Sequence, residues 1–178
     1  NVKNKKADTI ISAGNTGALL VISKLNLKMI ENIDKPALSA LWPNKKGMSV
    51  VLDLGANIEC SPKNLIDFSI MGSSLFKSLY PNDNAKVALL NIGSEEFKGN
   101  EIIKETYQQL NLKKNSDFEF KGYIEGNQLM NGDVNVIVTD GFTGNIALKT
   151  AEGTAKFITN NLKKSLTKNI ITKISLIF

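Results

Sequence analysis

The chain has 178 residues, of which 42% are hydrophobic and 22% charged, and its formal net charge is +5. It contains no histidine and one cysteine, Cys60, which excludes Ser-His-Asp and Cys-His nucleophilic sites, internal disulfides and thiolate-rich zinc clusters within the chain. No stretch reaches the roughly 18 consecutive apolar residues typical of a membrane span, and the polar N-terminus does not resemble a secretion signal, so we expect a cytoplasmic protein.

Strand-like and helix-like segments alternate along the first third of the chain. Residues Thr9–Ser12 are short and β-rich, and a glycine-rich turn and apolar residues at helical spacing over Ala18–Ile30 follow them. Ala37–Leu41 predicts a second strand, and Pro43–Gly47 predicts a turn. Met48–Leu54 is an almost continuous apolar run, which is typical of a strand buried on both faces of a parallel sheet.

The alternation continues through the rest of the chain. Ser61 and Pro62 form a typical helix start, with serine as the N-cap and proline at the first helical position. The elements predicted from there on are a helix to about Tyr80, a strand over Lys86–Asn91, a helix over about Asn100–Leu110, a strand over Phe118–Tyr123, a short helix over Gln128–Asn131, a strand over Val134–Val138, and a long helix that begins near Asn145.

This order of elements predicts the α/β class, with a mostly parallel sheet covered by helices on both faces. No linker rich in glycine, proline or serine divides the chain, so we expect one domain over residues 1–178. Ligands of such sheets bind at the carboxyl ends of the strands. The glycine-rich turns of this sequence lie at those predicted strand ends.

Two of these turns share one pattern. Ser12–Gly17 and Thr139–Gly144 both read Ser/Thr-x-Gly-x-Thr-Gly, and each lies between a predicted strand and a predicted helix. Glycine permits close approach of the backbone to a ligand, and the free N–H groups at a helix start favour an anion. Two such turns after neighbouring strands would bind one phosphate or stabilise one oxyanion. The alternative is that both are simple strand-to-helix turns, and neither matches a nucleotide-binding loop.

Two further turns place polar groups at predicted strand ends. Asp53–Asn57 contributes a carboxylate and an amide, and Asn91–Asn100 contributes Lys98. The Lys98 ammonium suits phosphate because it needs only proximity, and the alternative interpretation of Lys98 and Glu96 is a solvated loop. Asp140 either orients its own turn through backbone N–H groups or orients a substrate.

Taken together, the segments Ala7–Ala18, Asp53–Asn57, Met71–Ser73, Leu90–Asn100 and Val138–Asn145 resemble the phosphate acyltransferase family of bacterial phospholipid synthesis. The resemblance implies a three-layer α/β/α fold related to phosphotransacetylases and isocitrate- and isopropylmalate-type dehydrogenases. It implies transfer of an acyl group from acyl-carrier protein to inorganic phosphate, in a homodimer without metal or organic cofactor. Family members extend beyond both ends of this chain, so we expect an incomplete copy, and Glu59 stands where the family usually has aspartate.

We therefore predict two groups of site residues. The predicted catalytic residues are Asn15, Lys98, Asp140 and Asn145, and the predicted phosphate- or substrate-binding residues are Ser12, Gly14, Thr16, Gly17, Asp53, Asn57, Gly141, Thr143 and Gly144. Two alternatives stay open: a phosphotransacetylase that uses coenzyme A, and an inactive truncated or split-gene product that retains phosphate binding.

The predicted C-terminal helix, residues 146–178, would lead into a helical hairpin that this chain lacks. Its second half places Lys163 and Lys164 beside apolar residues, as in helices that lie on a membrane interface; these are Leu162, Leu166, Ile170, Ile171, Ile174, Leu176, Ile177 and Phe178. Peripheral membrane contact is one interpretation, and the alternatives are burial against a dimer partner or the start of the truncated hairpin. The lysines of the chain are scattered without interleaved aromatic residues, so we expect no nucleic-acid partner.

Overall fold

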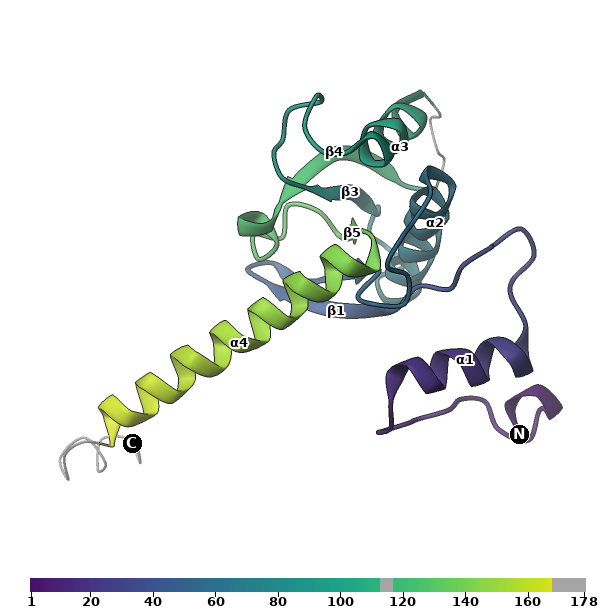
Figure 1. Ribbon diagram of the computed structural model, residues 1–178, viewed down its shortest axis with the longest axis horizontal. Helices are drawn as coiled ribbons and strands as arrows, with labels where there is room; N and C mark the ends of the chain where they lie inside the picture. Colours follow the sequence, from purple (N-terminus) through teal and green to yellow (C-terminus); the bar gives the residue numbers. More distant parts are fainter. Residues whose placement is uncertain (113–116, 168–178) are drawn as a thin grey trace. The chain divides into compact units, whose positions relative to one another are not determined.

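The computed structural model describes residues 1–112 and 117–167, which contain a mixed sheet and several helices (Figure 1). Two compact units are present, one over Asn1–Gly144 and a second that begins at Asn145. In chain order the elements are the 3-10 helix η1 (Val2–Asn4), α1 (Thr16–Leu27), β1 (Ser39–Asn44), β2 (Gly47–Leu52), α2 (Pro62–Leu79), β3 (Lys86–Asn91), α3 (Glu101–Leu112), β4 (Glu119–Glu125), the 3-10 helix η2 (Gly126–Gln128), β5 (Val136–Val138) and α4 (Gly141–Leu166).

The sheet has five strands in the order β1-β2-β5-β3-β4. The pairs β2–β5, β5–β3 and β3–β4 are parallel, and β1 is an antiparallel edge strand beside β2. The predicted α/β class with a mostly parallel sheet is therefore confirmed. The short strand β5 lies at the centre, where Val136–Val138 pairs with both Val50–Leu52 and Val87–Leu89.

The central strands are buried on both faces, as their unbroken apolar sequence predicted. Val50 and Val136 belong to a hydrophobic cluster with residues of α2 and α3, while the alternate residues Val51 and Ile137 are also almost fully buried. α2 packs very closely against this sheet. A Cβ atom added at Gly72 would lie only 2.5 Å from a Val136 methyl group, so glycine is required at that crossing.

The start of α2 confirms the prediction from Ser61 and Pro62. The Ser61 hydroxyl accepts a hydrogen bond from the Asn64 N–H, and the Asn64 side chain accepts one from the Ser61 N–H, which completes a capping box. Pro62 occupies the first helical position, where its missing N–H has no cost. This end of α2 is thus fixed by local sequence chemistry.

The predicted strand over Thr9–Ser12 is wrong. These residues have no regular structure, and none of the five strands pairs with them. A strand needs a neighbour to satisfy its backbone N–H and C=O groups, and a β-rich tetrapeptide cannot supply that neighbour itself. The helix after it does form, although α1 covers Thr16–Leu27 in place of the predicted Ala18–Ile30.

Some other predicted boundaries also shift. β1 and β2 form a hairpin, and β1 runs through Pro43 to Asn44 where the sequence predicted a turn. Proline is tolerated there because β1 is an edge strand with one unpaired side. The predicted helix over Gln128–Asn131 is the single 3-10 turn η2, and β5 begins two residues later than predicted.

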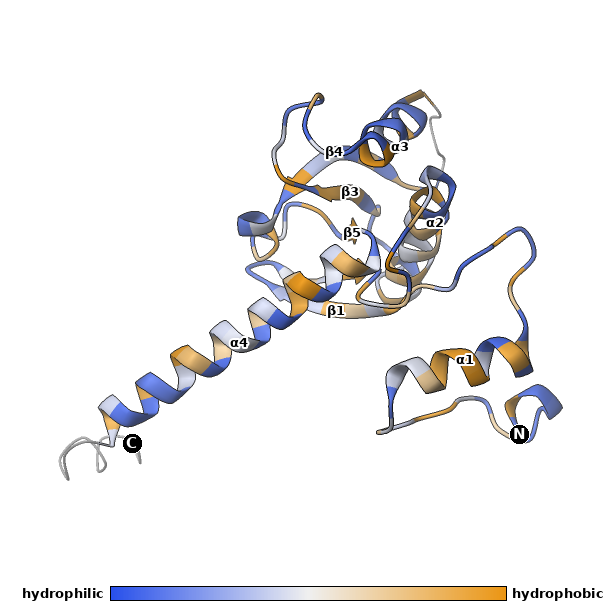
Figure 2. Ribbon diagram, viewed as in Figure 1, coloured by the Kyte–Doolittle hydropathy of each residue, from blue (hydrophilic) through white to orange (hydrophobic). Residues whose placement is uncertain are grey.

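The second unit contains most of α4. Hydrophobic and hydrophilic residues are interspersed along this helix (Figure 2), and Phe157, Ile158 and Leu162 are exposed. Among the helices of residues 1–112 and 117–167, none combines the length and apolar character needed to cross a membrane. The apolar residues predicted from Ile170 to Phe178 lie outside the described residues.

Candidate functional site

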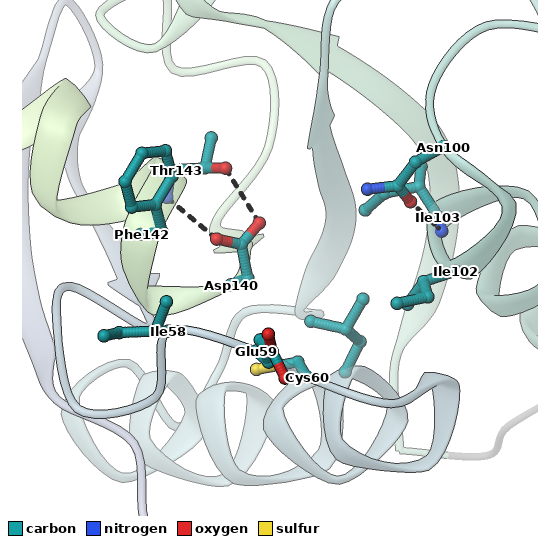
Figure 3. Close-up of a pocket in the computed structure, with 10 residues that line it drawn as sticks. Ile58, Glu59, Cys60, Asn100, Ile102, Ile103, Asp140, Phe142 and Thr143 are labelled. Atoms are coloured by element: carbon teal, nitrogen blue, oxygen red, sulfur yellow. Dashed lines mark hydrogen bonds between the residues drawn. The ribbon is translucent and has the colours of Figure 1, made fainter.

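A cavity of about 310 Å³ opens beyond the carboxyl ends of β2, β5 and β3 (Figure 3). Three segments from distant parts of the sequence line it: the loop from β2 with the start of α2, the start of α3, and the turn from β5 with the start of α4. Its position is the one that the predicted parallel sheet implies for a ligand. The lining residues are Ile58, Glu59, Cys60, Leu65, Asn100, Ile102, Ile103, Asp140, Phe142 and Thr143.

Helices α3 and α4 begin at this cavity, and each carries a side-chain cap. Asn100 Oδ1 accepts a hydrogen bond from the Ile103 N–H at 2.9 Å, and the Asn100 amide nitrogen points into the cavity (Figure 3). Asp140 caps α4: its Oδ1 accepts from the Thr143 N–H and its Oδ2 from the Thr143 hydroxyl, both at 2.8 Å. Two positive helix-dipole ends therefore face one space.

The first N–H groups of α4 are mostly engaged. Gly141 N–H donates to the Asn57 carbonyl at 2.7 Å, and Gly144 N–H donates to the Asp140 carbonyl at 2.9 Å. The Thr143 N–H donates to the Asp140 side chain, so the Phe142 N–H is the early amide of α4 without a recorded acceptor among the described residues. The backbone donor left for an anion at this helix start is thus that of Phe142.

Asp53 is fully buried and organises the loop that follows β2. Its Oδ1 accepts from the N–H groups of Leu38, Gly55 and Ala56, and its Oδ2 accepts from the N–H and the side-chain amide of Asn57. Five donors on one carboxylate leave it little capacity for a ligand. The contacts of Asp53 and Asn57 thus shape the loop against which α4 begins.

Two glycines allow the start of α4 to lie against this loop. A Cβ atom at Gly141 would lie 2.6 Å from the Asn57 carbonyl oxygen, and one at Gly144 would overlap the Asp53 carbonyl oxygen. Both glycines of the turn Thr139–Gly144, the second of the two turns that share a pattern, are therefore needed for close backbone packing. This packing role accounts for Gly141 and Gly144 without a ligand.

The first of the two turns, Ser12–Gly17, forms a helix cap like the one that Asp140 forms on α4. Asn15 Oδ1 accepts from the Ala18 N–H at 3.0 Å, and Ser12 Oγ accepts from the Gly14 N–H at 3.2 Å. Ser12, Gly14, Asn15, Thr16 and Gly17 are all exposed, and none of them lines this cavity. The first turn does not follow a strand of the sheet, so the expectation that both turns follow neighbouring strands is wrong.

Lys98 lies in the loop between β3 and α3, two residues before Asn100. Its N–H donates to the Glu95 carbonyl, and its own carbonyl accepts from the Asn91 side chain at 3.2 Å. The Lys98 side chain is half-buried and does not line the cavity. Asn145 is exposed and is the first residue of the second unit. Of the four predicted catalytic residues, Asp140 alone lines the cavity.

The Cys60 thiol at the cavity has a pKa above its ordinary value. Burial is the main cause, and the negative charges of Asp53 and Asp140 add to it, while Lys35 acts in the opposite direction. The thiol is therefore predominantly protonated near neutral pH and behaves as a small apolar group.

Of the ten residues that line the cavity, sequence reasoning predicted Asp140 and Thr143 as site members and missed the other eight, which are Ile58, Glu59, Cys60, Leu65, Asn100, Ile102, Ile103 and Phe142. One of them carried a usable signal: asparagine immediately before an apolar helical pattern is a typical N-cap, and an N-cap at a strand's carboxyl end lies where ligands bind. The apolar members carried none, because their convergence depends on the packing of three loops.

Comparisons with known proteins agree with this architecture. Over 175 residues the chain is 87% identical to the phosphate acyltransferase of Pelagibacter ubique, covering 98% of this chain and 53% of that protein. The phosphate acyltransferase of Maricaulis maris is 46% identical over 175 residues, with 98% and 50% covered. The chain thus spans about half the length of these curated relatives.

A solved structure supports the fold alone. The phosphotransacetylase EutD from Staphylococcus aureus matches with a TM-score of 0.60 at 17% identity, covering 87% of this chain and 53% of that one. A family profile described as "Fatty acid synthesis protein" matches residues 1–178. On that match, the chain belongs to the fatty acid synthesis protein family.

Proposed function

We propose that the protein transfers a fatty acyl group from acyl-carrier protein to inorganic phosphate and so forms acyl phosphate for phospholipid synthesis. The observation that carries this proposal is the cavity at the carboxyl end of the sheet, where starts of α3 and α4 meet an apolar wall. An acyl phosphate is an anion joined to an alkyl chain, and this cavity offers complementary surfaces for both parts. The relatives' name, phosphate acyltransferase, agrees with that chemistry.

The anionic end would bind at the helix starts. The Phe142 N–H has no recorded acceptor among the described residues, and the Asn100 amide nitrogen points into the same space. Asp140 brings a negative charge to this wall, but both of its oxygens accept hydrogen bonds from Thr143. We propose that Lys98, on the loop that leads to Asn100, supplies the positive charge that phosphate needs.

The acyl end would lie against the apolar wall. Ile58 and Phe142 are both largely exposed at the cavity, and Ile102 is more than one-third exposed. Exposed side chains of this size at a cavity favour an apolar ligand. The Cys60 thiol, held protonated, adds to the same surface.

In the proposed reaction, a phosphate oxygen attacks the thioester carbonyl carbon, and the carbon–sulfur bond breaks as the tetrahedral intermediate collapses. The carrier thiolate leaves and takes up a proton from solvent. Holding both reactants in one cavity supplies much of the acceleration. An amide donor such as the Phe142 N–H would stabilise the oxyanion, an interaction whose loss typically costs about 3 kcal/mol of barrier.

The remaining predicted residues receive roles of two kinds. Asp53 and Asn57, with Gly141 and Gly144, would position the start of α4, while Thr143 would complete its cap. The residues of the first turn, Ser12–Gly17, and Asn145 stay candidates for direct contact with phosphate or the thioester.

The test is acyl-phosphate formation by the full-length protein, measured with acyl-carrier protein and with the matching acyl-coenzyme A as donors. We expect turnover with the carrier protein and a large loss in Lys98→Ala and Asp140→Asn. The matched control is Lys121→Ala, because Lys121 is a lysine of β4 that pairs with Glu119 and does not line the cavity. Unchanged turnover in both site variants would remove these residues from the site, and preference for coenzyme A would replace the donor.

We further propose a cytoplasmic homodimer that contacts the membrane peripherally. The exposed Phe157, Ile158 and Leu162 of α4 support an apolar contact surface beside Lys163 and Lys164. Sedimentation and liposome flotation of the full-length protein with Ile158→Ser and Leu162→Ser test this. Loss of dimerisation alone would assign the surface to a partner copy, and loss of flotation alone would assign it to lipid; no change in either would reject both.

A further inference from the structure

The loop between β3 and α3 carries Lys98 and leads to the Asn100 cap at the cavity. Much of this loop is open to solvent: the side chains of Ile92 and Phe97 are 80% and 71% exposed. Such a segment orders a lysine only if specific contacts hold it. The contacts that hold this loop therefore fix the backbone of Lys98, whose ammonium group lies 5.6 Å from the centroid of the Phe97 ring in the same loop.

Two kinds of contact fix the loop. At its base, the Asn91 side chain donates to the Lys98 carbonyl at 3.2 Å, and the Lys98 N–H donates to the Glu95 carbonyl at 3.0 Å. At its middle, the Tyr107 hydroxyl of α3 donates to Glu96 Oε1 at 2.7 Å. The second contact ties the loop to a helix, and it is a short hydrogen bond to a charged acceptor.

Tyr107 is itself held in place by neighbouring rings. Its ring centroid lies 4.7 Å from that of Tyr123 and 5.6 Å from that of Phe120, the latter in an edge-on arrangement. Both partners belong to β4, next to β3 in the sheet. The phenol that binds Glu96 is thus anchored to the sheet and does not depend on the loop for its position.

We propose that Tyr107 is a positioning residue, which holds the β3–α3 loop through Glu96 and so sets the placement of Lys98 for phosphate. The role given to Lys98 rests on the proposed function. The tether between Tyr107 and Glu96 rests on the geometry alone, so the two parts are tested separately.

The tether is tested by tryptic cleavage after Lys98 in the full-length native protein. In Tyr107→Phe, which keeps the ring and removes the donor, we expect cleavage at Lys98 to accelerate about fivefold because the loop opens more often. Glu96→Ala should match it, and Glu96→Gln should fall between, since the amide oxygen still accepts a hydrogen bond. The double variant Tyr107→Phe/Glu96→Ala should cleave no faster than either single variant.

Glu105→Gln is the matched control. Glu105 lies on the same helix and accepts a hydrogen bond from Gln109 at 3.0 Å, away from the loop. It should leave the cleavage rate at Lys98 unchanged. Equal cleavage in Tyr107→Phe and in the unsubstituted protein would overturn the tether.

The positioning role is tested by steady-state kinetics of acyl-phosphate formation. We expect Tyr107→Phe to raise the KM for phosphate about fivefold, and to have no further effect when Lys98 is already alanine. Faster cleavage with unchanged phosphate kinetics would overturn the positioning role. If the unsubstituted full-length protein forms no acyl phosphate, the proposed function fails, and the cleavage rates then support or overturn the tether alone.

Discussion

The turns Ser12–Gly17 and Thr139–Gly144 share a sequence pattern and a local structure, but their surroundings differ. In both, the side chain before the helix accepts an N–H three residues later, from Ala18 in the first turn and from Thr143 in the second. The second turn follows a central strand, and its two glycines touch a buried loop. The first follows no strand, and α1 after it contains no buried residue.

A cap motif therefore determines where a helix starts but not where that helix lies in the fold. Hydrogen bonds within four residues are available wherever the chain goes. The position of the turn Thr139–Gly144 depends on groups that are distant in the sequence. The most important is Asp53, which lies 87 residues before Asp140. The same pattern therefore contributes to a cavity in one case and not in the other.

Adding a methyl group to a glycine of each turn should give the largest contrast. In Gly144→Ala the new Cβ would overlap the Asp53 carbonyl, and we expect a loss of about 3 kcal/mol in the free energy of unfolding. In Gly17→Ala the Cβ would lie 3.3 Å from the flexible Asn15 side chain, and alanine favours helix, so we expect no loss. Urea unfolding of the full-length protein measures both, and equal losses would contradict the comparison.

The next largest effect is expected at Asp53. In Asp53→Asn an NH₂ group replaces an oxygen that accepts backbone N–H groups, so we expect a loss of about 2 kcal/mol. Asp133→Asn serves as the control, because Asp133 pairs with Lys46 on the surface, and it should leave the unfolding midpoint unchanged. A stable Asp53→Asn protein would show that the buried network does not hold the second turn.

Removing either helix cap should cost less stability than the changes above. The loss should be similar for the two caps, but it should affect different parts of the protein. Asn15→Ala and Asp140→Ala each remove the side chain that caps a helix start, which typically costs about 1 kcal/mol. We expect the Asn15 change to raise amide exchange within α1 alone, and the Asp140 change to lower the global unfolding midpoint. Hydrogen exchange with mass spectrometry separates these outcomes, and a global effect of Asn15→Ala would show that α1 is coupled to the core.

The reaction rate of a thiol should distinguish the cavity wall from the turn Ser12–Gly17. Because burial and two carboxylates raise the Cys60 pKa, its thiolate forms only as the pH rises above the ordinary thiol range. We expect Cys60 to react slowly with a disulfide reagent at pH 8, and a Ser12→Cys thiol in a Cys60→Ser background to react quickly. Fast reaction of Cys60 at that pH would mean that the cavity wall is open.

The sequence predicted the elements whose signals are local or strongly apolar. Lys86–Asn91 is a strand with the predicted bounds, and Ser61 with Pro62 begins a helix as expected. Thr9–Ser12 shows the limit, since its composition favours a strand but nothing in the described sheet pairs with it. Strand formation depends on partners that a short segment does not specify.

The candidate site was predictable in its location but not in its membership. The carboxyl ends of the parallel strands follow from the β-α alternation, and Asp140 was recognised from its turn. Ile58 and Phe142 carry no chemical signal, and they join Asn100 at one cavity only because three loops pack together. The packing of Gly141 on the Asn57 backbone, at 2.6 Å for an added Cβ, is likewise invisible in the sequence.

A crystal structure of the full-length protein soaked with inorganic phosphate would show whether the cavity at the starts of α3 and α4 binds phosphate. We expect a phosphate at the cavity beside the starts of α3 and α4, within hydrogen-bonding distance of the Phe142 N–H and the Lys98 ammonium group. Phosphate bound at a site that includes neither group, with this cavity left empty, would contradict that expectation.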